Sequence, residues 1–514
     1  MNKKLIIEIL LVLLLGGLTS LSLPPLNFFL INFFTLSTFF IFLYKKISNP
    51  RESKFFFLYG WLFGFSYFLS NLYWITISLT FDPNFNFLIP IALILIPAFL
   101  GLFYGLVTFI FYKLKFRKLL SSFLLFSLLF GLVEFLRGNI LTGFPWNLFV
   151  YSLSENLRII SFVSIIGTYS LNLLIISFFS APAIYILRKS KVEVFVSILM
   201  LLIPILFLSY GKFYKQNFLN KEIIENPYLI RVIGSNISLD RFYISNQTEK
   251  TIYELINLSS PEPSKKTFFL WPEGIIPNTY LDELTLYKRL FNENFSENHL
   301  IGLGISSRSL VNGNYEYFNS LSLFDNKLNL LQNYNKVNLV PFGEFLPFEN
   351  LFNKVGLKII TNNISSFTKG EERKIIHIKN NSQEFKFLPL ICYEIIYTGN
   401  LTTNNNYDFI INISEDGWFG KSIGPKQHFA HSIFRAIETG KYVIRSANNG
   451  MTAIINPLGE IEKKIDYSKN GFIDFEKRRV IDPTIFSFYG NKIFMLIILL
   501  YIFLIFSINR IKDE

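Results

Sequence analysis

Eight long apolar segments constrain this chain more strongly than any other feature of its sequence. Each is close to the ~20 residues that an α-helix needs to cross ~30 Å of hydrocarbon, and each contains few charged side chains. The sequence therefore predicts a polytopic α-helical membrane bundle with eight spanning helices. We expect the first helix to be retained, because no small-residue cleavage site follows it. The expected spans cover residues 5–23, 26–44, 55–79, 88–112, 119–136, 159–187, 194–210 and 493–508.

The composition excludes two other classes of protein. Of the 514 residues, 51% are hydrophobic and 17% are charged, whereas intrinsic disorder requires low hydrophobicity and high net charge. The chain has 1 cysteine, Cys392, which excludes a scaffold held together by disulfides.

A long stretch of ordinary polarity separates the seventh apolar segment from the eighth. We therefore predict three parts: helices 1–7 in residues 1–210, a globular domain in residues 211–488, and the eighth helix with a tail in residues 489–514. Short β-rich runs alternate with helical stretches in the globular part, which predicts a layered α/β sandwich. Strands are expected at 229–233, 267–270, 300–304, 320–324, 387–391, 409–413, 442–446 and 452–455, and helices at 246–258, 282–292 and 428–439.

The formal net charge of +12 follows the predicted topology. Lysine and arginine gather at the amino end, after the second, fourth and sixth apolar segments, and in the carboxyl tail, whereas the alternate loops carry few. The positive-inside rule then places both termini in the cytoplasm and the globular domain outside it. The basic excess is thus a topology signal, and we expect no nucleic-acid partner.

Cys392 is the first candidate for chemistry. It directly follows the expected strand 387–391, and a strand that ends in a reactive side chain and a turn exposes a nucleophile well. A lone cysteine is more often a buried structural thiol. In an oxidising compartment, however, an unpaired thiol is a liability unless the protein uses it.

Glu273 and Lys336 complete a possible catalytic set. Glu273 follows an expected strand, Trp271 and Pro272, and partial desolvation of a carboxylate there suits a general base. Lys336 lies in an unusually apolar setting, where its ammonium can hold a thiolate and then stabilise an oxyanion. Taken singly, each residue is more often an ordinary surface side chain. Together with a cysteine, they suit attack on an acyl carbonyl.

Three spaced motifs carry a family resemblance: Trp-Pro-Glu ending at Glu273, Lys336 followed by Val-Pro-Phe-Gly-Glu, and Ile-Cys-Tyr-Glu around Cys392. They resemble the carbon–nitrogen hydrolase (nitrilase) superfamily with its Glu-Lys-Cys triad. With the flanking membrane helices, essentially the whole chain resembles the apolipoprotein N-acyltransferase family. Further matching segments are 143–147, 412–420, 424–428 and 445–450.

The resemblance implies a nitrilase-like αββα domain in which Glu273 is the general base, Lys336 stabilises the oxyanion and thiolate, and Cys392 is the nucleophile. It implies ping-pong transfer of an acyl chain from a phospholipid, through a thioester, to the α-amino group of a diacylglyceryl-cysteine on an apolipoprotein. It also implies a bacterial inner membrane protein with a periplasmic catalytic domain. No cofactor and no metal are expected, because the sequence has no phosphate-binding glycine loop, zinc spacing or dinucleotide fingerprint.

Six further residues are expected around the site. Glu344, Tyr393 and Glu394 match family positions that support the triad, although a purely structural role is an equal alternative. Large apolar side chains at the mouth of the site would keep water off a thioester and contact lipid. Those expected there are Phe342, Trp418 and Phe419.

The chain departs from the family pattern at four places that concern the lipid entrance rather than the triad. In the first strand of the globular domain a Gln is common, but this chain reads Val-Ile-Gly-Ser-Asn over residues 232–236. A small polar residue is frequent where Gly274 stands, and a mobile-loop tryptophan is replaced by Phe242. The pair Glu415–Asp416 stands where Asn-Asp or a similar pair is usual.

Two histidines suggest other chemistry that the sequence does not favour. His428 and His431 stand three residues apart on an expected helix, but no third metal ligand follows in register, so helix packing or surface is expected. A thiol-protease pair of Cys392 with His428 would leave the motifs of Glu273 and Lys336 without a role.

Two rival functions remain open at this point. A membrane-anchored thiol amidase would share the site but hydrolyse its substrate. A transporter with an accessory domain would need paired charges or broken helices in several spans, and the sequence offers few. Among them, Glu134 and Arg137 are expected to pair with each other, in support of structure or of lipid headgroup contact.

Overall fold

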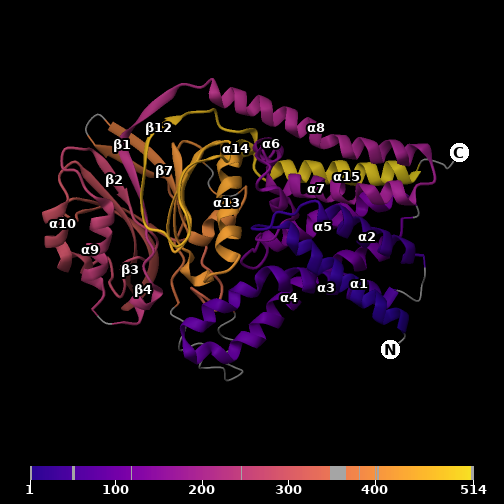
Figure 1. Ribbon diagram of the computed structural model, residues 1–514, viewed down its shortest axis with the longest axis horizontal. Helices are drawn as coiled ribbons and strands as arrows, with labels where there is room; N and C mark the ends of the chain where they lie inside the picture. The colour runs from indigo at the N-terminus through magenta and orange to yellow at the C-terminus, as the bar shows by residue number, and fades with distance from the viewer. Residues whose placement is uncertain are drawn as a thin grey trace.

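The computed structural model describes residues 3–48, 53–116, 118–244, 246–347, 366–380, 383–399, 401 and 404–510. A bundle of long helices occupies one end of an elongated molecule, and two β-sheets with flanking helices occupy the other (Figure 1). The long helices are α1 (Lys3–Thr19), α2 (Ile31–Lys46), α3 (Ser53–Leu72), α4 (Ile89–Leu114), α5 (Leu119–Asn139), α7 (Val163–Leu187), α8 (Lys191–Leu219) and α15 (Lys492–Arg510).

The bundle confirms the predicted polytopic membrane architecture. In the part of the chain that the structure describes, 7 helical stretches are long and apolar enough to cross a membrane, and each coincides with an expected span. The remaining expected span is α2, whose 16 residues extend only about 24 Å. It lies within the bundle against α1 and α7. Helices α5 and α7 are largely buried, whereas α8 and α15 present most of their apolar side chains outward.

Short elements connect these helices on the side nearer the sheets. They are η1 (Ser20–Ser22), η3 (Tyr73–Phe81), η4 (Pro83–Leu88), η5 (Phe149–Leu153) and α6 (Leu157–Ile160). The predicted domain boundary at residue 210 lies inside α8, which continues to Leu219 before β1 begins at Ile223. The division of the chain into three parts stays a prediction.

The sheets form the expected αββα sandwich. One six-stranded sheet has the order β12-β1-β2-β3-β4-β5, and the other has the order β11-β10-β9-β8-β7-β6. Helices α9 (Thr248–Ser259) and α10 (Lys288–Asn294) cover the first sheet, and α13 (Gly424–Thr439) lies between the second sheet and the bundle (Figure 1). The strands are β1 (Ile223–Gly234), β2 (Thr267–Leu270), β3 (His299–Val311), β4 (Asn314–Asp325), β5 (Leu330–Asn335), β6 (Ile376–Asn380), β7 (Gln383–Ile391), β8 (Phe409–Glu415), β9 (Tyr442–Asn448), β10 (Thr452–Ile455), β11 (Ile461–Ile465) and β12 (Gly471–Arg479).

All of the expected strands lie within observed strands, and the expected helices coincide with α9, with η7 (Glu283–Tyr287) and α10, and with α13. The four strands that the sequence did not predict are β5, β6, β11 and β12, which are the edge strands of the two sheets. Edge strands carry polar and charged side chains, so they lack the apolar run by which the inner strands are recognised.

Parallel pairing positions the candidate site. Strands β1, β2 and β3 run parallel in one sheet, and β7, β8 and β9 run parallel in the other. The carboxyl ends of parallel strands share one edge of a sheet, where side chains from successive strands converge. Residues that follow β2, β7 and β8 therefore meet at one edge of the sandwich.

Candidate active site

Cys392 occupies a sharp turn at the end of β7. It is the first residue of the helical turn η8 (Cys392–Ile396), and its φ of +49° lies in the left-handed region. Residues other than glycine rarely adopt this conformation, and those that do gather at functional sites. The residue is only 7% exposed. The turn thus holds a buried thiol at the edge where the strands converge.

Glu273 reaches the same edge from the end of β2. Its Oε1 accepts hydrogen bonds from Lys336 Nζ at 3.2 Å and Asn319 Nδ2 at 2.8 Å. Its Oε2 accepts from the backbone N–H of Glu415 at 2.9 Å, at the end of β8. The carboxylate is therefore held by contacts from three directions, and it connects the two sheets.

Lys336 follows β5 and is only 1% exposed. Its ammonium lies 3.2 Å from Glu273 Oε1 and 2.9 Å from Glu344 Oε1. Burial alone would lower the pKa of Lys336, but these two carboxylates outweigh it and raise the pKa above its ordinary value. The lysine is therefore a permanent cation in a buried setting.

The thiol of Cys392 lies within the electrostatic reach of both partners. Burial raises the pKa of Cys392 well above its ordinary value, and Glu273 raises it further, whereas Lys336 lowers it. The resting sulfur is therefore protonated at neutral pH, and a base must remove its proton before it can attack. Glu273 and Lys336 thus form a buried ion pair whose charges act on the Cys392 sulfur, and the catalytic triad of these three residues stays a prediction.

Glu344 and Asn319 complete this cluster. Glu344 Oε1 accepts from Lys336 Nζ and, at 2.7 Å, from Asn319 Nδ2, while its Oε2 accepts from the Val340 backbone N–H at 2.8 Å. Asn319 lies on β4 and bridges Glu273 to Glu344. Sequence reasoning missed Asn319, because a single asparagine on a strand carries no motif.

Glu394 joins the lysine segment to the cysteine turn. Its carboxylate is fully buried and accepts from the backbone N–H groups of Val337 at 2.9 Å and Asn338 at 3.1 Å, just after Lys336. It also accepts from the backbone N–H of Ile391 at 2.8 Å, just before Cys392. The expected supporting position of Glu394 therefore corresponds to a clamp between two catalytic candidates.

Tyr393 connects the cysteine turn to the helix bundle. Its hydroxyl donates to the carbonyl oxygen of Gly143 at 2.9 Å, in the connection after α5. Tyr397 donates to the neighbouring carbonyl of Thr142 at 2.8 Å. The segment 143–147, which the sequence singled out, thus contacts the cysteine turn from the bundle through Gly143.

The three aromatic residues expected at the mouth have different surroundings. Phe419 packs against Trp74 and Trp146, with ring centroids 4.8 and 5.9 Å apart. Trp418 packs against Phe81 of η3 at 5.5 Å. Phe342 is 56% exposed. Trp418 and Phe419 therefore lie where the sandwich meets the bundle, and their contact with lipid stays a prediction.

The departures from the family pattern have local explanations. Gly274 has a φ of +50°, which favours glycine, and a Cβ there would meet no atom within 4 Å. Glu415 accepts from Arg241 at 2.7 Å and lies fully within the fold. Phe242 stacks on Trp418 with ring centroids 6.0 Å apart, in the same aromatic region.

The two histidines of α13 are packed inside the molecule. His428 lies 3.0 Å from Asp416 through Nδ1 and 3.2 Å from the Cys392 carbonyl oxygen through Nε2. His431 packs against the rings of Trp146 and Tyr151. Of the two expected alternatives, surface or packing, the structure shows packing.

The expected pair of Glu134 and Arg137 is confirmed. Both side chains are buried in α5, where they form an ion pair, and Arg137 also donates to the Phe144 carbonyl oxygen. The pair thus supports the segment that Tyr393 contacts.

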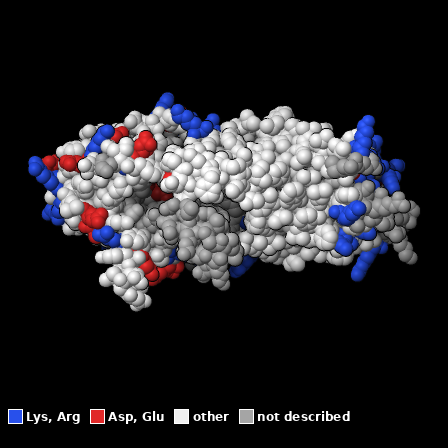
Figure 2. Space-filling model, turned by 90° about the horizontal axis from the view of Figure 1, so that it is seen from below, with Lys and Arg blue, Asp and Glu red and all other residues white. Residues whose placement is uncertain are grey.

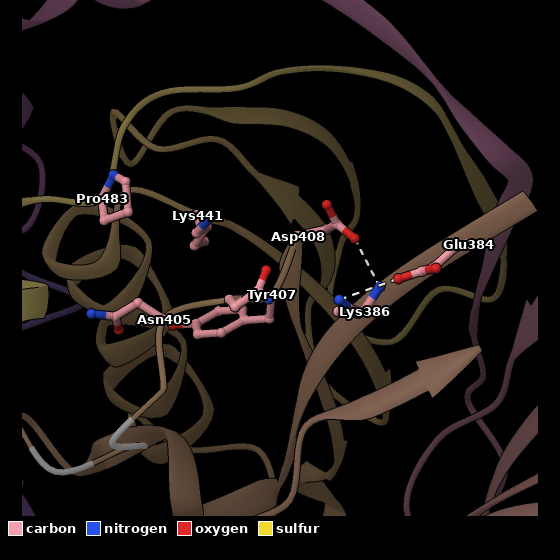
Figure 3. A pocket seen from close by; sticks show the side chains of 8 residues that line it. Glu384, Lys386, Asn405, Tyr407, Asp408, Lys441 and Pro483 are labelled. Carbon is pink, nitrogen blue, oxygen red and sulfur yellow. Dashed lines mark hydrogen bonds and ion pairs between the residues drawn. The ribbon is translucent and has the colours of Figure 1, made fainter. Parts of the chain in front are cut away.

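A polar cavity of about 550 Å³ lies near the other end of β7 (Figure 3). Its lining includes Glu384 and Lys386 on that strand and Asp408, Tyr407 and Lys441 on neighbouring segments. Lys386 precedes the cysteine turn by about 20 Å of extended strand. This cavity is therefore separate from the buried cluster.

An αββα sandwich that buries a glutamate, a lysine and a cysteine at one edge, and that is carried on a bundle of apolar helices, defines a membrane protein of the nitrilase type. Two family models match the chain: the apolipoprotein N-acyltransferase N-terminal domain over residues 15–181 and the carbon–nitrogen hydrolase over residues 267–476.

Curated relatives match almost the whole chain. The apolipoprotein N-acyltransferase of Rickettsia prowazekii is 32% identical over 98% of each chain. That of Rhizobium rhizogenes is 30% identical over 90% of this chain and 89% of its own. A solved amidase of the nitrilase superfamily from Nesterenkonia covers 51% of this chain and 93% of its own, at 11% identity and a TM-score of 0.34. The chain belongs to the apolipoprotein N-acyltransferase family.

Proposed function

We propose that this chain transfers an acyl chain from a phospholipid to the α-amino group of the diacylglyceryl-cysteine at the amino end of an apolipoprotein. One observation carries the proposal: a buried cluster of Glu273, Lys336 and Cys392 in a chain that matches curated N-acyltransferases along nearly its whole length. The membrane helices support the same reading, because both substrates are lipids. A soluble amidase would have no need of them.

In the first half-reaction, Glu273 takes the proton from Cys392 as the sulfur bonds to the ester carbonyl carbon of the phospholipid. The carbonyl oxygen becomes an oxyanion beside the Lys336 ammonium, which is already in place and needs no reorganisation. Collapse of this intermediate breaks the ester C–O bond. The lysophospholipid alkoxide leaves with the proton that Glu273 returns, and a thioester remains on Cys392.

In the second half-reaction, the α-amino group of the lipidated cysteine attacks the thioester carbon. Glu273 takes the proton that the amine loses, and Lys336 again faces the oxyanion. Breaking the C–S bond releases the amide product, and the sulfur recovers its proton from Glu273. We propose that Phe342, Trp418 and Phe419 keep water away from the thioester during this cycle.

The basic side chains support a topology for this reaction. Lysine and arginine gather at the end of the bundle farthest from the sheets (Figure 2). By the positive-inside rule, we propose that both termini face the cytoplasm and that the catalytic domain lies on the periplasmic side of the inner membrane. The proposed parts are residues 1–210, 211–488 and 489–514.

The test is intact-mass analysis of the purified full chain with a defined phospholipid and a synthetic diacylglyceryl-cysteine peptide. We expect the protein to gain one acyl chain that hydroxylamine removes, and the peptide to gain the same chain when it is added. Cys392→Ser should show neither gain, because the serine hydroxyl is a far weaker acid than the thiol.

The products distinguish transfer from hydrolysis. Free fatty acid without acylated peptide would support a membrane-anchored thiol amidase instead. A Cys392→Ser variant that acylates the peptide at the normal rate would remove the thioester from the mechanism.

A further inference from the structure

His428 contacts the backbone of the candidate nucleophile. Its Nε2 lies 3.2 Å from the carbonyl oxygen of Cys392, and the ring is fully buried. The other side-chain donor to this oxygen, among the residues that the structure describes, is Asn412 Nδ2, which is farther away at 3.5 Å and lies 3.0 Å from the carbonyl of Leu390. The histidine is therefore the nearer side chain that holds this carbonyl.

The surroundings of the ring determine where its proton lies. A carbonyl oxygen can only accept, so Nε2 carries a proton and donates it to Cys392. On the other side, Nδ1 lies 3.0 Å from Asp416 Oδ1, which accepts, and 3.2 Å from Arg445 Nη2, which donates. Burial and Arg445 lower the pKa of His428 below its ordinary value, although Asp416 opposes them. The contact with the Cys392 carbonyl oxygen thus makes Nε2 a donor.

One face of the His428 ring packs against a residue that follows helix α5 of the bundle. His428 stacks on Trp146, with ring centroids 5.3 Å apart and an interplanar angle of 19°. Trp146 Nε1 also donates to Gln427 at 2.9 Å. The connection after α5 therefore holds the first turns of α13 by two contacts, the ring stack on His428 and this hydrogen bond. Through His428, a contact from the bundle reaches the backbone of Cys392.

The turn at Cys392 needs such support. Its left-handed φ is unfavourable for a residue with a side chain and persists only where the surroundings impose it. A hydrogen bond to the carbonyl of this residue fixes the peptide plane that follows it. That plane sets the direction of the side chain toward Glu273 and Lys336.

We infer that His428 is a positioning residue that holds the Cys392 turn in its reactive conformation and couples that turn to Trp146 in the connection after α5. The inference rests on the proposed function, in which Cys392 carries the acyl group. Misplacement of a reacting atom by ~1 Å costs about 100-fold in rate. Loss of the His428 donor should therefore slow acylation of Cys392 without weakening substrate binding.

Two substitutions distinguish the effect of the Nε2 hydrogen-bond donor from the effect of the aromatic ring. His428→Phe keeps an aromatic ring against Trp146 but removes the donor. His428→Gln removes the ring but places an amide N–H near the position of Nε2. His431→Phe is the matched control, because His431 is buried on the same helix, packs on Trp146 and makes no hydrogen bond to Cys392 among the described residues.

The experiment is a stopped-flow burst with p-nitrophenyl octanoate on the full chain in detergent, followed by intact mass. The burst amplitude measures the fraction of folded active sites, and its rate constant measures how well each site is positioned. We expect His428→Phe to lower the rate constant at least about tenfold at an unchanged half-saturating ester concentration. His428→Gln should recover most of the rate, and His431→Phe should retain it.

The outcomes separate this inference from the proposed function. A normal rate constant in His428→Phe, or an equal loss in His431→Phe, overturns the inference alone. A wild-type protein without a Cys392-dependent burst overturns the proposed function and the inference with it. If His428→Phe gives no burst amplitude, the variant has not folded, and His428→Asn replaces it as the variant without a donor. The asparagine amide is too short to reach the Cys392 carbonyl. A His428→Asn rate equal to that of His428→Gln then contradicts the inference.

Discussion

Cys392 experiences opposing electrostatic influences from the two residues that are proposed to act with it. Burial and the Glu273 carboxylate favour the neutral thiol, whereas the Lys336 ammonium favours the thiolate. Their balance keeps the proton on the sulfur in the resting protein. A carboxylate beside a protonated thiol is the arrangement that general-base catalysis needs, because the proton moves only as the new bond forms.

Glu273→Gln should therefore have opposite effects on two reactions of the same sulfur. Removing the negative charge lowers the pKa of Cys392, so alkylation by iodoacetamide at pH 7 to 8 should be faster and its pH midpoint should fall. Acyl transfer should be lost, because the proton acceptor is gone. Alkylation of the single cysteine is followed by mass across the pH range.

The exposed Glu297→Gln is the control for this charge change, since Glu297 lies on the surface away from the cluster. An alkylation midpoint in Glu273→Gln that stays at or above the wild-type value would contradict the electrostatic account of the site.

Lys336→Ala should slow acylation of Cys392 by roughly 100-fold, or about 3 kcal/mol, which is typical of losing one oxyanion donor. The lysine faces both Glu273 and Glu344, so no other described cation at this position can replace it. Single-turnover rates with phospholipid measure the loss. Lys327→Ala, on an exposed turn, should leave the rate unchanged. A Lys336→Ala rate near the wild type would exclude the ammonium from the mechanism.

The sequence singles out the three central candidate residues by their motifs, and it singles out their surroundings only in part. Glu273 and Cys392 each stand in a short motif at the end of an apolar strand, and Lys336 stands in a short motif of its own. Asn319 has no such signal, and its role depends on a register of β4 that only the folded sheet reveals. The clamp made by Glu394 likewise requires that two segments 57 residues apart come together.

At the scale of elements, the inner strands and the long helices followed from their apolar runs. The four edge strands did not, because only one side of each is paired and the polar face hides the pattern; in β11, for example, 4 of the 5 residues are exposed. The membrane helices have the strongest signal because every backbone polar group must be satisfied inside the helix in lipid. A helix as short as α2 lies near the lower limit of the length by which a spanning helix is recognised in a sequence.

The break in α7 yields a prediction at the same scale. Gly167 interrupts this helix with a φ of +78°, and a Cβ there would lie 2.0 Å from the ring of Phe486. The freed backbone N–H of Thr168 donates to Glu438 on α13 at 2.8 Å. Gly167→Ala adds left-handed strain, which costs roughly 1–3 kcal/mol, and a clash with α14 (Ile485–Tyr489).

We therefore expect Gly167→Ala to lower the melting temperature of the detergent-solubilised protein. Gly17→Ala is the matched control, because Gly17 lies in the helix α1 and an added Cβ would have its nearest neighbour 4.0 Å away. Equal melting temperatures for the two variants would show that the break in α7 accommodates a Cβ at residue 167 without strain.

At the scale of the whole molecule, an excess of basic side chains lies at the end of the bundle farthest from the sandwich (Figure 2). The sandwich carries acidic and basic residues together, whereas the far end of the bundle carries lysine and arginine (Figure 2). Between them lies a surface of mainly uncharged residues. The buried cluster lies near the junction of the sandwich and the bundle, since Tyr393 contacts the Gly143 carbonyl. This arrangement suits chemistry at the outer face of a bilayer.

A cysteine-labelling experiment tests that orientation, because replacing Cys392 by serine leaves a chain without thiols. In this background, Leu286→Cys places a thiol on the sandwich at a position that is 79% exposed, and Lys189→Cys places one in the basic loop after α7. The positive-inside rule predicts that a membrane-impermeant maleimide labels Leu286→Cys in intact spheroplasts and labels Lys189→Cys only after permeabilisation. The reverse pattern would place the catalytic cluster in the cytoplasm, where it could not meet a substrate on the outer leaflet.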